Sequence, residues 1–239
     1  MGGAKGLIVK VIPSQIAVPF VKRHHYSGKV VNNSSLHFGV FMDGALHGVM
    51  SFGSPTDKRK VIGLVVDDNG NPAPWHDMLE LNRMAFDDVL PKNSESRAIS
   101  VAFRLIKKNA PNIKWVLSFA DGTQCGDGTI YRASGFMLTG IKENKSLLLL
   151  PNGQKVHELT LRSSPNAPRP ELNGKTYSDI TNGGASTKKY CDFTGAKQIV
   201  GFQLRYIRII DKRYHLAVPD LPFSEIERRG ARMYKGEKR

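Results

Sequence analysis

Hydrophobic and polar positions along the first 160 residues follow strand and helix periods in turn. Apolar or alternating runs predict strands at residues 7–12, 36–42, 45–52, 78–86, 113–119 and 136–141. Apolar residues at helical spacing predict helices at residues 14–21, 93–109 and 128–134. The second and third strands are joined by Asp43-Gly44, which is a strong hairpin signal. We therefore expect a compact α/β unit in this part of the chain.

Three stretches depart from this order. Residues 54–76 are polar and marked by Gly and Pro, so we expect an insertion at the surface. Residues 146–150 and 156–161 predict a final hairpin. Residues 163–197 hold neither period for long and are rich in Pro and Gly, which predicts an extended arm or a mobile loop.

The chain returns to apolar alternation at residues 199–210 and ends in a basic tail. We expect a GNAT-like domain at 1–162, a Pro/Gly-rich arm or loop at 163–198, and a returning strand with a basic segment at 199–239 that packs on the same domain. The order of elements predicts an α/β fold with a GNAT-like mixed sheet flanked by helices, a surface insertion and a basic C-terminal extension.

Charge and cysteine usage narrow the partners and the compartment. The 35 Lys and Arg against 21 Asp and Glu give a net charge of +14. Such a chain is attracted to polyanions, so we expect nucleic acid as its partner, although anionic metabolites or solubility alone could explain the charge.

No window approaches about eighteen consecutive apolar residues, and residues 1–6 lack a signal-peptide pattern, so we expect neither a membrane span nor secretion. The two distant cysteines, Cys125 and Cys191, fit a reducing cytoplasm and leave nitrogen and oxygen ligands for any metal.

Histidine, tyrosine and aspartate follow the predicted elements at places where ligands can bind. His25 and Tyr26 end the first helix and could carry protons or hold a metal, or could simply complement the helix dipole. Asp121 follows the strand at 113–119, at the edge where open α/β sheets bind ligands, but Asp-Gly is also ordinary turn chemistry. Tyr131, ten residues later, could return to the same cleft or pack at the surface.

Glu80 lies on the strand at 78–86 and is a candidate general base. A salt bridge to Arg83 or Arg97 is an equally good explanation of this carboxylate.

The N-terminus of the helix at 93–109 is a candidate anion site. Its free N–H groups are accompanied by Lys92, Ser94, Ser96 and Arg97. GNAT enzymes hold the coenzyme A pyrophosphate at this place with a Gly-rich segment, and this segment has no glycine. Phosphate binding is therefore expected here, whereas coenzyme A itself is left open.

Two basic stretches are candidates for contacts to DNA phosphates. They lie in the insertion and near the C-terminus, and an ordinary solvated face is the alternative explanation for both: Lys58, Arg59 and Lys60, then Arg228, Arg229 and Arg232.

Taken in order, these segments resemble the phage Mom family. The segments are HHYSG, the hairpin strands GVF and GVMSFG, ELNRMAF, SESRAISVAFRLIKKNAP, WVLSFADGTQCGDGTIYRASGF, QLRYIRIIDK and LPFSEIERRGARMYKGEKR. The resemblance covers about residues 20–162 and 199–235.

The resemblance implies a GNAT-like enzyme that converts adenine N6 in double-stranded DNA to a carbamoylmethyl (acetamido) derivative. This modification shields phage DNA from restriction in the host cytoplasm. The family's functional residues carry over to His25, Tyr26, Asp121 and Tyr131. The family is linked to bound iron, for which His25, Asp121 and Tyr131 would be a suitable nitrogen–oxygen set. We expect the adenine to be flipped from the duplex.

The donor remains open between acetyl-coenzyme A and another acetamide donor, and a homodimer is compatible with the sequence. Rival functions are a GNAT-type N-acyltransferase that uses acetyl-coenzyme A on a protein or small amine, and a non-enzymatic nucleic-acid-binding protein. A metal-dependent nuclease is disfavoured because no acid-pair motif is evident.

Overall fold

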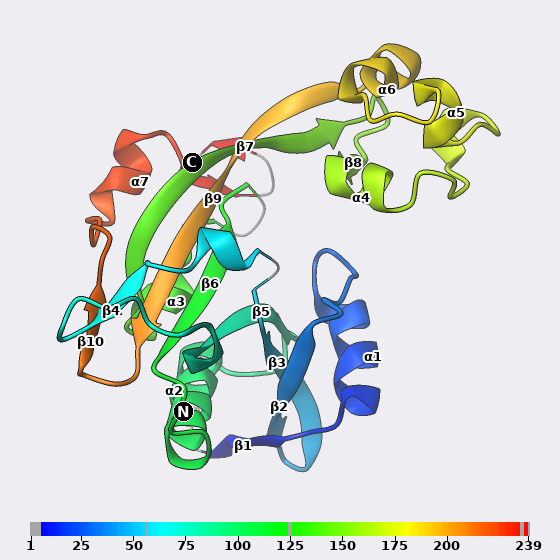
Figure 1. The fold of residues 1–239 in the computed structure, drawn as a ribbon. Coiled ribbons are helices and arrows are strands. Elements are labelled where there is room, and N and C mark those ends of the chain that lie inside the picture. The colour runs from blue at the N-terminus through cyan, green and yellow to red at the C-terminus, as the bar shows by residue number, and fades with distance from the viewer. Residues whose placement is uncertain (1–5, 56, 124–125, 235–236, 239) are drawn as a thin grey trace. The chain divides into compact units, whose positions relative to one another are not determined.

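The computed structural model describes residues 6–55, 57–123, 126–234 and 237–238 (Figure 1). The strands are β1 (Ile8–Val11), β2 (Ser34–Met42), β3 (Ala45–Gly53), β4 (Val65–Asp67), β5 (Met78–Phe86), β6 (Trp115–Asp121), β7 (Met137–Leu149), β8 (Lys155–His157), β9 (Lys197–Ile209), β10 (Tyr214–Leu216), β11 (Met233–Tyr234) and β12 (Glu237–Lys238). The α-helices are α1 (Ser14–His24), α2 (Ser94–Asn109), α3 (Thr129–Ala133), α4 (Glu158–Ser163), α5 (Tyr177–Thr181), α6 (Thr187–Thr194) and α7 (Ser224–Arg228). Short 3-10 turns are η2 (Lys58–Lys60), η3 (Trp75–Asp77) and η4 (Pro170–Leu172).

Eight strands form one mixed sheet in the order β1-β2-β3-β5-β6-β9-β7-β8. The pairs β1–β2, β2–β3 and β3–β5 are antiparallel. Strands β5 and β6 pair in parallel, and helix α2 forms the crossover between them. A mixed sheet flanked by helices confirms the predicted fold class.

The chain divides into two compact units. Unit 1 consists of residues 1–120, 128–140 and 204–225, and unit 2 consists of residues 121–127, 141–203 and 226–239. Strands β7 and β9 each contribute residues to both units. Unit 2 thus includes residues 141–162, which the sequence pattern assigns to the GNAT-like domain.

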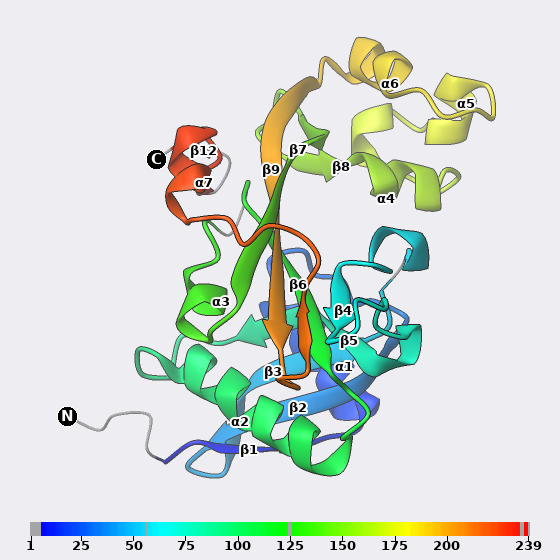
Figure 2. The same cartoon turned by 60° about the vertical axis from the view of Figure 1, so that its left-hand side comes forward.

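Helices α1 and α2 cover opposite faces of strands β1, β2 and β3 in unit 1 (Figure 2). Helix α1 packs Ala17 and Val21 onto Val49 and Ala85 of the sheet. Helix α2 buries one face, as its spacing predicts, through Ala98, Ile99, Ala102, Phe103 and Ile106. This packing fixes both the end of α1 and strand β5, which carry candidate catalytic residues.

The insertion at 54–76 is more than a surface loop. Its strand β4 pairs antiparallel with β10, and Val61, Leu64 and Val65 are buried against Trp115 and Ile207. These buried positions could not be predicted, because the apolar residues follow no regular period within a polar, Gly- and Pro-rich segment.

Three expectations for residues of unit 2 are corrected by the structure. Strand β7 runs unbroken through the predicted gap between 141 and 146, and the predicted strand at 156–161 is mostly helix α4. The predicted arm at 163–198 contains η4, α5 and α6 around a buried core with Leu172, Tyr177 and Tyr190.

Local caps explain the helices that periodicity missed. Thr176 and Asp179 form a reciprocal capping box at the start of α5, and Ser186 caps α6. Each of these helices is too short to display a hydrophobic period. In the described part of the chain, no helix is both long enough and apolar enough to cross a membrane.

Candidate active site

Strands β5 and β6 separate in the middle of the sheet in unit 1. Their registered pairs run from Met78–Trp115 to Leu81–Ser118 in the described residues. At that point Ser118 turns its hydroxyl to the Leu81 carbonyl oxygen, 2.8 Å away. A shift in register opposite Ser51 and Phe52 makes Asn82 an extra residue on β5. A bulge beside parting strands is a common way to direct side chains into a site.

Arg83, just after this bulge, is the electrostatic centre of the site. Its Nε donates to the carbonyl oxygen of Lys29 at 3.0 Å, and its Nη1 donates to the carbonyl oxygen of Asn82 at 2.6 Å. Burial lowers the pKa of the Arg83 guanidinium, and the neighbouring side chains of Tyr26, Glu80 and Tyr131 raise that pKa again. We call His25, Tyr26, Glu80, Arg83 and Tyr131 the Arg83 cluster.

His25 is held by the turn that follows α1. Its Nδ1 accepts a hydrogen bond from the backbone N–H of Ser27 at 3.2 Å and lies 2.8 Å from the Ser27 hydroxyl. Burial, and secondarily the charge of Arg83, lowers the pKa of His25 to about 4. The ring is therefore neutral at pH 7. Because the backbone N–H can only donate, this contact favours the tautomer that carries its proton on Nε2.

Glu80 has the properties of a proton acceptor at neutral pH. Burial raises the pKa of its carboxyl group to about 7, and the Arg83 charge opposes a further rise. A group whose pKa lies near the operating pH can accept and release protons efficiently. The predicted association of Glu80 with Arg83 is therefore present as an electrostatic one, and it does not keep Glu80 fully ionised.

The two tyrosines of the Arg83 cluster come from different elements. Tyr26 stacks against His25 with ring centroids 4.3 Å apart and is 59% exposed, so it lies at the rim. Tyr131 on α3 packs between two aromatic rings. Its ring centroid lies 5.2 Å from that of Tyr206 and 5.3 Å from that of Phe136. The structure thus brings together four predicted catalytic residues: His25, Tyr26, Glu80 and Tyr131.

Asp121 belongs to unit 2, so its predicted association with His25 stays a prediction. Its Oδ1 accepts a hydrogen bond from the backbone N–H of Thr123 at 3.0 Å. The turn chemistry expected of Asp-Gly is therefore present, alongside any role of this carboxylate in catalysis.

Asn82 is a site residue that sequence reasoning missed, and Arg83 was expected only as a possible salt-bridge partner of Glu80. The Asn82 side chain is 9% exposed, and its Oδ1 accepts from the Ser34 hydroxyl at 2.8 Å. Its Nδ2 has no partner among the described residues. Leaving a buried amide donor unpaired costs about 1–3 kcal/mol, so a ligand atom that accepts a hydrogen bond from this Nδ2 would gain a favourable contact. The bulge that produces this arrangement has no sequence signature.

The residues of unit 1 do not fit the predicted iron site. The permanent positive charge of Arg83 lies among the would-be ligands and opposes a second cation. The Ser27 contact also favours a proton on His25 Nε2, the atom that a metal would need. No group of three His, Cys, Asp or Glu side chains suited to a metal occurs in the described part of the chain.

The predicted anion site at the start of α2 is only partly available to a ligand. Ser94 is fully buried, and its hydroxyl donates to the Pro91 carbonyl oxygen at 2.6 Å. Ser96 donates to the Asn93 carbonyl oxygen at 3.2 Å, whereas Lys92 and Arg97 are exposed. The backbone N–H of Ser94 also donates to the Pro91 carbonyl oxygen, at 3.2 Å. Binding of a phosphate or coenzyme A at this helix end stays a prediction that rests on the two cations, Lys92 and Arg97.

The basic side chains predicted to contact DNA are all exposed. In the insertion, Asp57 lies 3.4 Å from Arg59 and 3.3 Å from Lys60, and Lys58 lies over the Trp75 ring at 5.7 Å. In the C-terminal segment, Arg232 pairs with Glu227 at 2.5 Å, and Arg228 and Arg229 are exposed on and just after α7. Their role in DNA binding stays a prediction.

Two solved structures with a similar arrangement of elements are acetyltransferases. The ribosomal-protein-S18-alanine N-acetyltransferase from Escherichia coli is 9% identical, with a TM-score of 0.45 over 86% of this chain and 94% of that one. A GNAT family acetyltransferase from Elizabethkingia anophelis with acetyl-CoA bound is 12% identical, with a TM-score of 0.42 over 64% of this chain and 94% of that one. At this level of similarity, their ligands are no evidence for a ligand here.

Sequence similarity assigns the chain to a family, which the structural similarity does not. A curated relative, methylcarbamoylase mom from Escherichia phage Mu, is 40% identical over 165 residues. The match spans 67% of this chain and 64% of the relative, which is less than two thirds of that protein's length. The family model of the Mom protein family matches residues 6–225, which include the whole Arg83 cluster. The chain therefore belongs to the Mom protein family.

Proposed function

We propose that this chain is an enzyme that converts adenine N6 in duplex DNA to its carbamoylmethyl (acetamido) derivative, protecting phage DNA from restriction in the host cytoplasm. Membership of the Mom protein family and the phage relative named a methylcarbamoylase support this activity. One observation carries the chemistry: the Glu80 carboxyl group interacts with the Arg83 guanidinium and has a pKa of about 7.

The chemistry needs a base because the N6 lone pair is delocalised into the adenine ring. In the transfer, N6 forms a bond to the methylene carbon of a carbamoylmethyl donor, and the donor's leaving group departs with the bonding electrons. N6 loses one proton in the same step. The Glu80 carboxylate accepts that proton, and general-base assistance of this kind contributes about 10²–10⁴-fold to a rate.

The other members of the Arg83 cluster supply positive charge and hydrogen bonds. The Arg83 guanidinium stabilises negative charge that develops on the leaving group, an effect that is strong in a partly buried site. The neutral His25 donates from Nε2 to an acceptor on the donor molecule. The Asn82 amide, buried and unpaired at one end, binds the acetamide group or the base. Tyr131 positions the cluster from α3, and Asp121 is a further functional residue by family motif.

Access to N6 requires that the adenine leave the helix, because the paired base has no room for a new substituent. Flipping costs a few kcal/mol of unstacking, which contacts from the basic surface to the DNA backbone offset. The exposed cations at residues 58–60 and 228–232 are suited to such contacts.

Mass spectrometry of nucleosides tests the proposal without knowledge of the donor. Plasmid DNA is recovered from cells that express the chain and is digested to nucleosides. We expect a deoxyadenosine species heavier by one carbamoylmethyl group, and we expect much less of it with Glu80→Gln. Unmodified deoxyadenosine in the presence of abundant, folded protein would refute the proposed function. A thermal-shift titration with coenzyme A tests separately whether the donor is a thioester of that cofactor.

A further inference from the structure

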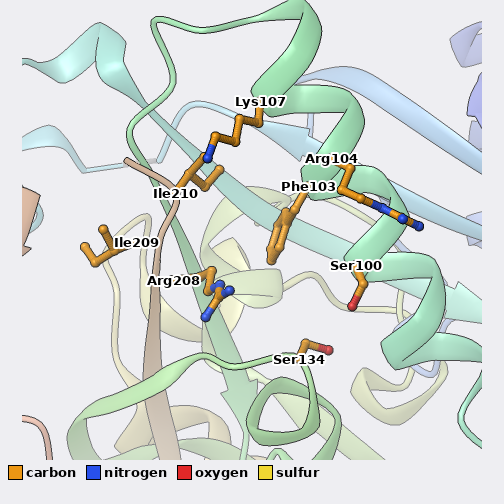
Figure 3. A pocket seen from close by; sticks show the side chains of 8 residues that line it. All are labelled: Ser100, Phe103, Arg104, Lys107, Ser134, Arg208, Ile209 and Ile210. Atoms are coloured by element: carbon orange, nitrogen blue, oxygen red, sulfur yellow. The ribbon is translucent and has the colours of Figure 1, made fainter. Parts of the chain in front are cut away.

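Unit 1 contains a second hollow, formed by none of the residues of the Arg83 cluster. It has a volume of about 480 Å³ and is lined by Ser100, Phe103, Arg104, Lys107, Ser134, Arg208, Ile209 and Ile210. These residues come from α2, from the position just after α3, and from the end of β9 and the position after it. Figure 3 shows Phe103, Lys107 and Arg208 around the space between α2 and β9. We call this hollow the α2–β9 pocket.

The charge of the α2–β9 pocket has one sign. Arg104, Lys107 and Arg208 are cations, and no acidic side chain is among the described residues that line it. Asp211, next to Ile210 in the chain, already pairs with Lys114 at 3.3 Å and Arg213 at 2.7 Å. Three cations without a lining counter-charge attract an anion from solution.

Arg208 is held in place before any ligand arrives. Its Nη1 donates to the carbonyl oxygen of Gly135 at 2.7 Å. Gly135 has a φ of +73°, and a Cβ built on it would lie 2.5 Å from this Nη1. Glycine therefore permits both the backbone conformation and the close approach of the guanidinium. The remaining N–H groups of Arg208 are available for a further acceptor, since a guanidinium has five donors.

The neutral lining limits which ligand fits. The Ser100 hydroxyl donates to the Ser96 carbonyl oxygen at 2.9 Å, and the Ser134 hydroxyl donates to the Ile130 carbonyl oxygen at 2.8 Å. Recognition of an anion must therefore come from the cations. Phe103 provides an apolar wall, whereas Ile209 turns its side chain away from α2 and packs against the core cluster that contains Trp115 (Figure 3). The volume is larger than a bare phosphate needs. This combination suits a phosphate group that carries a sugar.

We infer that the α2–β9 pocket binds a phosphate group of a nucleic acid or nucleotide, through Lys107 and Arg208 with Arg104 at the rim. Charge-assisted hydrogen bonds from Arg and Lys are the usual way in which proteins hold phosphates. The inference rests on the proposed function only in naming duplex DNA as the carrier of the phosphate. A free nucleotide offers the same chemistry, and binding assays separate the two sources.

The decisive measurement is equilibrium binding with Lys107→Gln, Arg208→Gln and their combination. The probes are a short DNA duplex, adenosine monophosphate and inorganic phosphate, each titrated at several salt concentrations. We expect the double variant to weaken duplex binding by about tenfold or more at low salt, and to reduce the slope of log K against log salt by roughly two. Lys108→Gln is the matched control, because Lys108 is the next residue on α2, is exposed and does not line the pocket.

Arg208→Lys separates a placed guanidinium from charge alone. It keeps the positive charge but loses the bond to Gly135, so we expect weakened binding with a nearly unchanged salt slope. Loss of mononucleotide binding without loss of duplex binding would assign the phosphate to a free nucleotide. Unchanged affinity of the double variant for all three probes, or an equal loss in Lys108→Gln, would overturn the inference.

The same variants distinguish this inference from the proposed function. If no modified adenine is found in cells but the double variant still loses affinity for the duplex, the proposed function fails and the phosphate pocket stands. If adenine is modified and the double variant binds every probe as the unaltered chain does, the pocket assignment fails alone.

Discussion

Arg83 donates from its Nε to the backbone carbonyl oxygen of Lys29, 3.0 Å away. This bond links strand β5 to the turn after α1, so the segment that bears His25 and Tyr26 is tied to the strand that bears Glu80. The Arg83 charge adds to the lowering of the His25 pKa that burial causes, and it opposes the rise of the Glu80 pKa that burial causes. One side chain therefore contributes to both the position and the protonation of its neighbours, and substitutions in the Arg83 cluster should have coupled effects.

Glu80→Gln removes the proton acceptor and keeps the shape of the side chain. We expect the rate of adenine modification to fall by about 10²-fold or more. For the unaltered chain, activity should rise with pH through about 7, because the carboxylate is the active form and the pKa of Glu80 is about 7. Modification rates measured from pH 5.5 to 8.5 test this. The residual activity of Glu80→Gln should lack that rise, and Asp88→Asn, an exposed acid beyond the end of β5, should retain it.

Arg83→Gln should shift the pH profile of the modification rate as well as lower the rate itself. The Arg83 charge holds down the pKa of Glu80, so its removal raises that pKa further and shifts the rising limb to higher pH. Arg83→Lys keeps a charge near Glu80 but loses the paired contacts to Lys29 and Asn82, so we expect a lower rate with a nearly unchanged midpoint. Equal midpoints in the Gln and Lys variants would contradict the electrostatic role of Arg83.

The stability of the chain should depend on His25 in acid. The folded-state pKa of His25, about 4, lies below its ordinary value of 6.5, so between these pH values the unfolded chain binds more protons. Stability is therefore lost as the pH falls from 6.5 towards 4. His25→Gln should reduce this loss, as measured by the pH dependence of Tm. His24→Gln is the matched control, because the neighbouring His24 stacks on Phe20 within α1, and it should keep the loss seen in the unaltered chain.

The elements of unit 1 could be predicted because their signals are long and regular. Strand β5 and helix α2 begin and end close to the predicted residues, since each has an uninterrupted period and a clear stop. The sequence also indicates His25, Glu80 and Tyr131, each at the end or middle of a well-predicted element. Their mutual proximity could not be read from the chain, because it depends on the pairing of β3 with β5 and on the crossover through α2.

Asn82 and the helices of unit 2 could not be predicted for different reasons. Asn82 owes its position to one extra residue in strand β5, and a bulge changes no periodicity that a short strand can display. Helices α5 and α6 have five and eight residues, so their caps carry more information than their hydrophobic pattern. Between the capped helices lies Asn182-Gly183-Gly184, a segment typical of a loop.

Asn82 should affect substrate binding more than folding. Asn82→Asp keeps the size and the Ser34 contact but replaces the unpaired amide donor with an acceptor. A lost hydrogen bond to substrate in a buried site costs about 1–3 kcal/mol, which is roughly 5- to 150-fold in kcat/KM. Ser34→Ala removes the other contact of the same amide and should cost less activity. Unfolding curves of both variants provide the control, because a purely structural Asn82 would lower stability and leave kcat/KM of the folded fraction unchanged.

The basic turn η2 should contribute fewer phosphate contacts than its three cations suggest. Asp57 lies within 3.4 Å of Arg59 and 3.3 Å of Lys60, so the four side chains together carry a net charge of about +2. Each phosphate neutralised changes the slope of log K against log salt by about 0.9. The triple variant Lys58→Gln, Arg59→Gln, Lys60→Gln should therefore reduce that slope by roughly two rather than three.

Asp57→Asn supplies the opposite test at the same turn. It removes the competing carboxylate and frees Arg59 and Lys60, so duplex affinity at low salt should increase while the triple variant loses affinity. Because Asp57 also accepts a hydrogen bond from the Arg59 backbone N–H at 3.1 Å, circular dichroism is needed to confirm that the fold is intact. Opposite shifts in two variants of one turn cannot arise from general destabilisation, whereas unchanged slopes in both would show that η2 does not contact the DNA backbone.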